Sequence, residues 1–495
     1  MPLSKDHYIN LRNGMFDSTN SDDLKHLFTR FASDPNRARL VVHFHGGLVN
    51  EKTGMAIAEH LLPVYHSAGS YPVFFVWESG LLEVLSHNLS EISSEKIFQL
   101  LLKNLLQFTV AKLKQKAVAR GRLLELPNDL EVKAELDRRE IATPYAALDQ
   151  IILTPGEKLQ DVEEQQFLNQ ISADREIELE ANKIADSFLS ARDMDVYRQI
   201  SHGTSVRGSL RTLMSPSIMD EIRSEELATG KSKGFLTTAF ILKHALSILR
   251  RTVNRFARQR SHGVYTTIIE ELLREFYLSN VGEVIWRLMK QDTEDAFKGD
   301  PLLYGGTAFL EGIKAHWLAG GHPRIILVGH STGAVYICHF LKYAQKRLPI
   351  DIKFDVIFLA PACTFNLFSS TLQDSAGRIS GIRIFGMQDK VERANQLVPV
   401  LYPHSLLYFV SGILENEADM PIMGMQRFYS GVSPFDAAGY PDIEKVRIFI
   451  QKPECKVWSV ELSGPGRMSR CTRHTDFDEE EDTINSLQYI IRQGL

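Results

Sequence analysis

Short apolar runs recur in the first and last parts of the chain, and each has the length of a buried strand. The runs occupy residues 38–44, 71–77, 324–328, 354–361, 382–387 and 456–462. Helical patterns separate most of them, for example near residues 52–68. Strands that are apolar on both faces and alternate with helices are typical of a mostly parallel sheet covered by helices. We therefore predict an α/β fold, with residues 8–11 as a further edge strand.

Between residues 80 and 300 the strand signals fade and helical spacing of apolar residues dominates. A helix opens near residue 93, and a Glu-rich helical stretch occupies residues 161–190. Residues 201–230 are less regular and are predicted to be a loop. We interpret residues 80–300 as a helical insertion, acting as a lid or a partner-docking module, within a domain formed by residues 1–79 and 301–495.

The segment from Lys231 to Arg260 contains eight lysines or arginines and no acidic residue, and its first half is strongly apolar. A basic amphipathic helix of this kind can make peripheral contact with an anionic membrane or dock a protein partner. The alternative is a helix whose apolar face covers a site and whose charges face water or the neighbouring Glu-rich stretch. We favour the alternative.

The apolar run at 324–328 leads into Gly-His-Ser-Thr-Gly and then into an apolar helical segment at 334–341. A serine on a sharp turn between a strand and a helix needs small residues two positions before and after it. Gly329 and Gly333 occupy these positions around Ser331. The pattern favours Ser331 as a nucleophile over an ordinary Gly-Ser turn.

A serine nucleophile needs backbone N–H donors for the oxyanion that forms when it attacks a carbonyl. One donor comes from the residue after the nucleophile, here Thr332. The other comes from a loop after an early strand, and the run at 38–44 ends in His45-Gly46-Gly47. We predict that Thr332, with Gly47 or Leu48, forms an oxyanion hole; the alternative is a plain Gly-Gly turn.

A serine hydroxyl also needs a base, and the base needs a carboxylate that orients it. In a sheet of this type the chain order is serine, acid, histidine, each in a loop at the carboxyl end of a strand. Asp389 follows the run at 382–387 and is the predicted acid, with Glu392 as the alternative. His474 follows the last run and is the predicted base.

Other histidines are less suited to act as the base. His330 lies inside the turn beside the serine, and His43 and His45 belong to the early strand and its loop. His404 precedes an apolar helix that it could cap, or it could contact substrate. His474 is preferred because of its place in the chain.

Composition narrows the class of protein further. The net charge of −5 argues against a nucleic-acid binder, and no apolar run is long enough to span a membrane. Four dispersed cysteines without metal-type spacing, of which Cys338 and Cys363 lie in apolar segments, favour a reduced, cytoplasmic protein. The acidic run at 476–482 is expected at the N-terminus of a helix rather than at a metal, and no cofactor is expected.

Together the Gly329–Gly333 motif, the His45-Gly46-Gly47 loop, Asp389 and His474 resemble the α/β-hydrolase superfamily of serine hydrolases, most closely its lipase- and esterase-like members. The resemblance covers residues 1–79 and 301–495. It implies a Ser-His-Asp catalytic triad that cleaves an ester or related acyl bond, with an acyl or lipid substrate, through an acyl-enzyme. The insertion is larger than the usual cap. It motivates an alternative, a hydrolase effector subunit of a larger complex in which residues 80–300 dock a protein partner and regulate the site.

Overall fold

The computed structural model describes residues 3–47, 49–77, 81–119, 159–187, 233–278, 282–398, 401–460 and 463–495, with a few isolated positions between 218 and 224. Most of residues 201–230, predicted to be a loop, lie outside this part of the chain.

An eight-stranded sheet forms the centre of one body, with the strand order β2-β1-β4-β3-β5-β6-β7-β8. Its strands are β1 (Tyr8–Arg12), β2 (Met15–Phe16), β3 (Arg39–Phe44), β4 (Tyr71–Trp77), β5 (Arg324–His330), β6 (Phe354–Leu359), β7 (Ile379–Gly386) and β8 (Lys456–Trp458). All neighbours pair in parallel except β1 and β2. The predicted α/β architecture with a mostly parallel sheet is confirmed.

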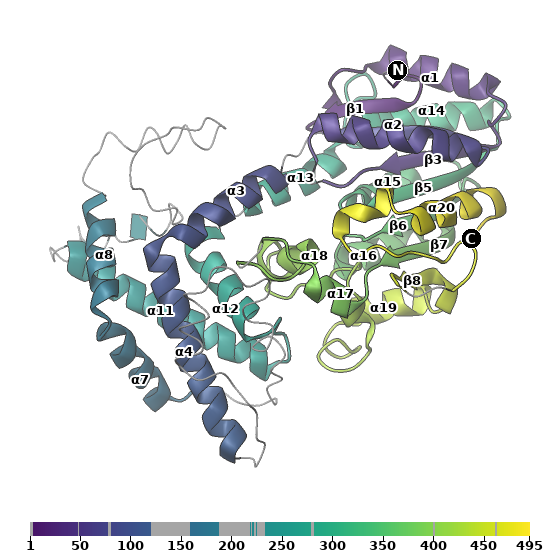
Figure 1. The fold of residues 1–495 in the computed structure, drawn as a ribbon. Coiled ribbons are helices and arrows are strands. Elements are labelled where there is room, and N and C mark those ends of the chain that lie inside the picture. Colours follow the sequence, from purple (N-terminus) through teal and green to yellow (C-terminus); the bar gives the residue numbers. More distant parts are fainter. Residues whose placement is uncertain are drawn as a thin grey trace.

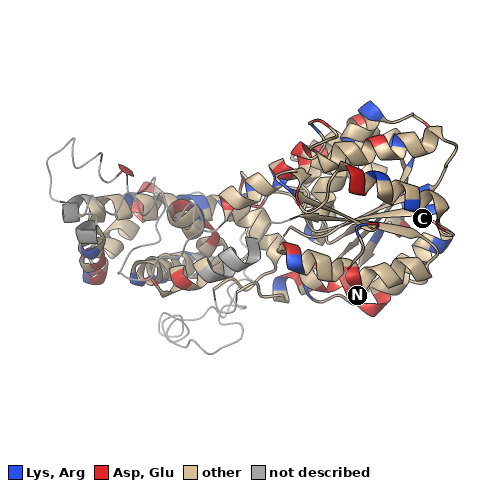
Figure 2. Ribbon diagram, turned by 90° about the horizontal axis from the view of Figure 1, so that it is seen from above, with Lys and Arg blue, Asp and Glu red and all other residues tan. Residues whose placement is uncertain are grey.

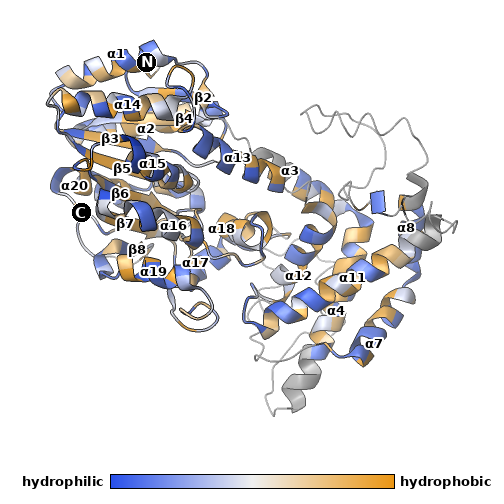
Figure 3. Ribbon diagram, turned by 180° about the vertical axis from the view of Figure 1, so that it is seen from behind, coloured by the Kyte–Doolittle hydropathy of each residue, from blue (hydrophilic) through white to orange (hydrophobic). Residues whose placement is uncertain are grey.

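Helices cover both faces of this sheet (Figure 1). The helices around the sheet are α1 (Ser21–Ser33), α2 (Glu51–Ser67), α14 (Gly305–Leu318), α15 (Gly333–Arg347), α16 (Phe365–Ser375), α17 (Asp389–Ala394), α18 (Leu406–Phe409), α19 (Pro441–Phe449) and α20 (Glu481–Gln493). Successive side chains of a strand point to opposite faces of the sheet. In β3, Val41 packs in the layer with α2 and α20, whereas Val42 and Phe44 pack on the opposite side with α15. The sheet strands and the inner sides of these helices are correspondingly hydrophobic (Figure 3).

The described part of the insertion is helical and forms a second body beside the sheet, reached through α3 and α13 (Figure 1). Its helices are α3 (Leu81–Ser94), α4 (Lys96–Ala119), α7 (Asp161–Ser172), α8 (Arg175–Ser187), α11 (Lys233–Ala257), α12 (Val264–Leu272) and α13 (Glu283–Asp295). The Glu-rich stretch is two helices rather than one. Asp174 interrupts it, and its carboxylate accepts a hydrogen bond from the backbone N–H of Glu176 (3.1 Å), the local bond by which aspartate favours helix starts.

Helix α11, which contains most of the basic segment, lies inside this helical body. Its apolar residues, including Phe240, Ile248 and Phe256, are buried. Its arginines pair with acids of the insertion itself: Arg250 contacts Glu164 of α7 at 2.6 Å. Charges of both signs are interspersed along the helices of both bodies (Figure 2). The ion pairs of α11 thus agree with the favoured alternative of internal partners, whereas its apolar face packs mainly on α8 and α12 of the insertion rather than over the predicted site.

Two predicted strands differ from those observed. The last strand ends at Trp458 because Val460 takes a left-handed conformation (φ 64°) that turns the chain out of the sheet. Strand β1 is not at the edge, since it continues through a tight turn into β2. The four cysteines are buried free thiols. In the part of the chain that the structure describes, no helix is long and apolar enough to cross a membrane.

Candidate active site

The turn between β5 and α15 carries Ser331 at the carboxyl edge of the sheet. Ser331 has φ of 53°, a strained conformation for a residue with a side chain. A methyl group at Gly329 would lie 2.7 Å from the carbonyl carbon of Gly333, and one at Gly333 would overlap the carbonyl oxygen of Phe44. Both glycines are therefore required by close backbone packing, as the sequence pattern predicts.

The loop after β3 lies against this turn. A methyl group at Gly46 would be 3.3 Å from the Cβ of Ser331, and one at Gly47 would be 2.8 Å from the Oγ1 of Thr332. The structure thus brings Gly47 and Thr332 together beside Ser331, and Thr332 precedes the first residue of α15. Leu48, the other predicted donor, lies outside the described residues.

His45 fixes the start of this loop and does not face the serine as a base. Its ring stacks on Trp77, with centroids 4.0 Å apart. Its Nδ1 donates to the carbonyl oxygen of Gly46 (2.7 Å), and its Nε2 accepts from the backbone N–H of Trp77 (3.1 Å). Burial lowers the pKa of His45 to about 4, so this neutral tautomer persists at neutral pH.

His474 lies beside the turn, in the short helix His474–Asp478 after β8. Its ring centroid is 5.3 Å from that of His330, and its carbonyl oxygen accepts a hydrogen bond from His330 Nε2 (2.9 Å). Neither ring nitrogen of His474 has a hydrogen-bond partner among the described residues, although both are buried. The described structure therefore brings His474 to the site without joining it to Ser331 or to an acid.

A buried ion pair holds the His474 segment in place. His330 Nδ1 lies 2.6 Å from a carboxylate oxygen of Asp478, and His43 Nε2 is 3.7 Å from the other oxygen. His330 Nε2 must donate to the carbonyl of His474, so a proton on Nδ1 makes His330 the cation of the pair. The sequence predicts Asp478 only as part of an acidic helix start. It does not predict this pairing, because nothing in the spacing of 330 and 478 indicates contact.

The pKa shifts agree with this arrangement. Burial lowers the pKa of His330, but the charge of Asp478 and two hydrogen bonds outweigh burial and raise it overall. Burial alone would raise the pKa of Asp478; the His330 charge instead lowers it to about 2. Burial and the His330 charge hold the pKa of His474 well below its usual range. His474 is therefore neutral at pH 7, the state that accepts a proton.

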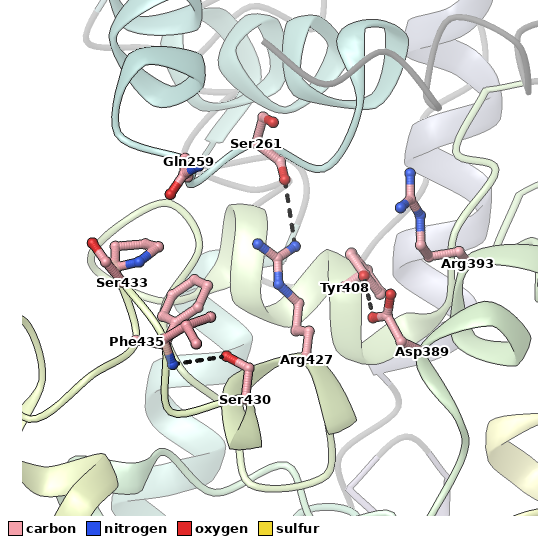
Figure 4. A pocket seen from close by; sticks show the side chains of 11 residues that line it. Gln259, Ser261, Asp389, Arg393, Tyr408, Arg427, Ser430, Ser433 and Phe435 are labelled. Atoms are coloured by element: carbon pink, nitrogen blue, oxygen red, sulfur yellow. Dashed lines mark hydrogen bonds between the residues drawn. The ribbon is translucent and has the colours of Figure 1, made fainter. Parts of the chain in front are cut away.

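Neither of the two predicted acids is hydrogen-bonded to His474 in the described structure. The Asp389 carboxylate accepts a hydrogen bond from the Tyr408 hydroxyl (2.6 Å) and lines a cavity of its own (Figure 4). Glu392 is fully buried, and the Ser405 side chain is the neighbour that favours its ionised form. The assignment of Asp389 to the triad, with Glu392 as the alternative, stays a prediction.

The buried Glu392 carboxyl predicts a pH dependence of stability. Burial raises its pKa from 4.5 to about 8. Between these values the unfolded chain loses the proton and the folded chain keeps it, so the free energy of unfolding falls as pH rises through this range. Glu392→Gln removes this dependence. Urea denaturation at several pH values is expected to show Glu392→Gln gaining stability over the parent as pH rises from 5 to about 8. If the free energy of unfolding depends on pH in the same way in both chains, burial does not raise the pKa of Glu392. Glu479→Gln, at an exposed carboxyl, is the control.

His404, another histidine considered as a base, has a different role. Its two ring nitrogens lie 2.9 Å from the carbonyl oxygen of Arg393 and 2.8 Å from that of His262. It therefore joins the sheet domain to the insertion. No group of side chains suited to hold a metal ion occurs among the described residues.

Met289 is a further residue near the turn that sequence reasoning missed. It lies on α13, the helix that returns from the insertion, and its thioether sulfur occupies the space directly beside the Gly47 Cα. Ser331 is 2 % exposed and Thr332 is fully buried. The position of Met289 in the apolar stripe of a helix gave no signal for this contact.

Comparisons of the chain with protein-family models, with curated proteins and with solved structures found no match.

Proposed function

We propose that this protein is a serine hydrolase of the α/β-hydrolase type that cleaves an ester or related acyl bond. The observation that carries the proposal is the conformation of Ser331. It stands at positive φ on a turn where both flanking glycines are sterically required, with the Gly46–Gly47 loop and His474 beside it. Strain of this kind is retained where a function needs it.

In the proposed reaction, Ser331 Oγ attacks the carbonyl carbon of the substrate while His474 takes its proton. The backbone N–H groups of Thr332 and of Gly47 or Leu48 bind the oxyanion. His474 returns the proton to the leaving group, and water releases the acyl-enzyme by the same steps. No metal or cofactor takes part in this scheme.

The carboxylate that orients His474 is Asp389 in this proposal, because Asp389 follows β7 at the carboxyl edge of the sheet. The Asp389 carboxylate is hydrogen-bonded to Tyr408 in the described structure. A rearrangement must therefore bring this carboxylate to His474. Asp478 acts indirectly, holding the backbone of His474 through His330. Asp389→Asn is expected to lower kcat without lowering the free energy of unfolding. Asp478→Asn is expected to lower both.

Labelling with a fluorophosphonate probe tests the proposal. The probe phosphonylates only an activated serine, and peptide mass spectrometry locates the adduct. We expect modification at Ser331 in the parent chain and none in Ser331→Ala. An adduct elsewhere, or equal labelling of Ser331→Ala, would refute the assignment of the nucleophile. Ser67→Ala, at an exposed serine on α2, controls for general effects of substitution.

The contact of Met289 with Gly47 supports a second candidate function, a hydrolase whose activity is regulated through its insertion. Three contacts hold α13 on the sheet domain: Trp286 Nε1 (2.9 Å) and Lys290 Nζ (2.7 Å) donate to Glu415, and Lys342 Nζ donates to Glu294 (2.7 Å). In this position Met289 blocks the approach to Gly47. A protein partner that moves α13 through residues 80–300 would open the site.

Shortening the covering side chain is expected to speed labelling. Met289→Ala removes the thioether from the space beside Gly47. We expect the labelling rate of Ser331 to rise about tenfold, which corresponds to about 1.4 kcal/mol removed from the cost of opening. Met289→Leu fills a similar volume and is expected to label like the parent. Equal rates for all three chains would mean that Met289 does not limit access.

A further inference from the structure

The side-chain hydroxyl of Thr332 is buried beside the nucleophile without a hydrogen-bond partner. Thr332 is fully buried, and its Oγ1 has no partner among the described residues. Burial removes a hydroxyl from water, so leaving its hydrogen bonds unmade costs free energy. Buried polar groups in native proteins are nearly always paired, and an exception beside a nucleophile points to a group that is kept for the reaction.

The position of Thr332 just before α15 does not account for this hydroxyl. A threonine at a helix start usually accepts a hydrogen bond, through its side-chain oxygen, from a backbone N–H of the first turn. Such a cap requires an extended backbone, whereas Thr332 has helical angles, φ of −66° and ψ of −19°, and its side chain makes no cap hydrogen bond. The N–H groups of Val335 and Tyr336 instead donate to the Thr332 carbonyl oxygen, at 2.8 and 3.1 Å. These N–H groups are therefore paired without the hydroxyl.

The Thr332 hydroxyl lies on the side of the turn where the oxyanion hole is predicted. A methyl group at Gly47 would be 2.8 Å from Thr332 Oγ1, just as one at Gly46 would be 3.3 Å from the Cβ of Ser331. The two glycines thus lie against the serine and the threonine in turn. A threonine hydroxyl rotates about its C–O bond and can direct its proton toward an acceptor on this side.

We propose that the Thr332 hydroxyl is a third hydrogen-bond donor to the oxyanion, in addition to the two backbone N–H groups. The inference rests on the proposed function, in which Ser331 attacks a carbonyl carbon. The carbonyl oxygen gains negative charge in that step, and the hydroxyl donates a hydrogen bond to it while keeping its own proton. A hydrogen bond to a charged acceptor is stronger than one to a neutral carbonyl, so the hydroxyl stabilises the transition state more than the bound substrate.

The thioether of Met289 leaves this donor available. Its sulfur lies in the space beside the Gly47 Cα, close to where the Thr332 hydroxyl lies. Thioether sulfur is a weak acceptor, and the hydroxyl makes no hydrogen bond to it. When the thioether moves aside for a substrate, the hydroxyl therefore has no bond to break before it donates to the oxyanion. A donor that is already in place and unpaired needs little reorganisation during the reaction.

Thr332→Val tests the inference, because it exchanges the hydroxyl for a methyl group of similar size. With p-nitrophenyl acetate we expect kcat to fall by about tenfold to a hundredfold and KM to stay close to that of the parent, since the lost bond acts in the transition state. The free energy of unfolding is expected to stay the same or to rise, because no partner of the hydroxyl is lost. Thr332→Ser restores a hydroxyl and is expected to be about tenfold faster than Thr332→Val. Thr29→Val, at an exposed threonine on α1, is the matched control and should keep the parent kcat.

The outcomes separate this inference from the proposed function. Ester hydrolysis by the parent that Ser331→Ala lacks, together with an unchanged kcat in Thr332→Val, would overturn the role of the hydroxyl alone. A kcat of Thr332→Ser no higher than that of Thr332→Val would overturn it as well. A clear loss of stability in Thr332→Val, measured by urea denaturation, would give the hydroxyl a structural role instead. Absence of both hydrolysis and Ser331 labelling in the parent would refute the proposed function, and this inference with it.

Discussion

Ser331→Ala and His474→Ala are each expected to lower kcat toward an activated ester by a factor on the order of 10⁵. The double variant is expected to be no slower than either single one. Serine and histidine act as a unit in nucleophilic catalysis, so removing either removes nearly all the benefit of the other. The remaining rate reflects the oxyanion donors and substrate binding.

The comparison is made with p-nitrophenyl acetate under saturating conditions, with circular dichroism and urea denaturation as checks on folding. His322→Ala, at an exposed histidine, is the matched control and should keep the parent rate. If the two fold-losses in kcat multiply in the double variant, Ser331 and His474 act independently. Such a result would exclude the proposed proton transfer between them.

Glu270→Ala is expected to lower the free energy of unfolding by about 3–5 kcal/mol, the cost of breaking a buried ion pair. Glu270 on α12 is fully buried, and its carboxylate accepts from Arg255 (2.6 Å) and from the Tyr402 hydroxyl (2.6 Å) and lies 2.7 Å from His262 Nδ1. The substitution leaves the Arg255 guanidinium buried with less compensation. Because Tyr402 belongs to the sheet domain, it also weakens the docking of the insertion.

Glu164→Ala supplies the comparison within the same helical body. Its partner Arg250 is 55 % exposed, so water replaces the lost contact and the expected change is below about 1 kcal/mol. Urea denaturation of both variants measures the difference. Similar small losses in the two variants would show that the Glu270 cluster contributes no more than a surface ion pair.

Features that depend on local geometry were predictable from the sequence. Glycines two positions on either side of Ser331 reflect steric limits within one turn, and the observed backbone has no room for side chains there. Apolar runs predicted the strands of the sheet because strands buried on both faces need few polar residues. The run at 456–462 predicted too long a strand, since the chain turns at Val460, whose N–H donates to the carbonyl oxygen of Ser469 (2.8 Å), a residue outside that run.

The sequence by itself determined the α/β class, the helical character of the insertion and the turn that carries Ser331, because each follows from spacing along a short stretch of chain. Only the tertiary structure decided which charges meet. It directed Asp389 to Tyr408, paired Asp478 with His330, and turned the basic helix α11 toward the acids of its own body. It also set Met289 against Gly47. These contacts join residues far apart in the chain, and charge or hydrophobicity at one position does not specify its partner among many similar ones.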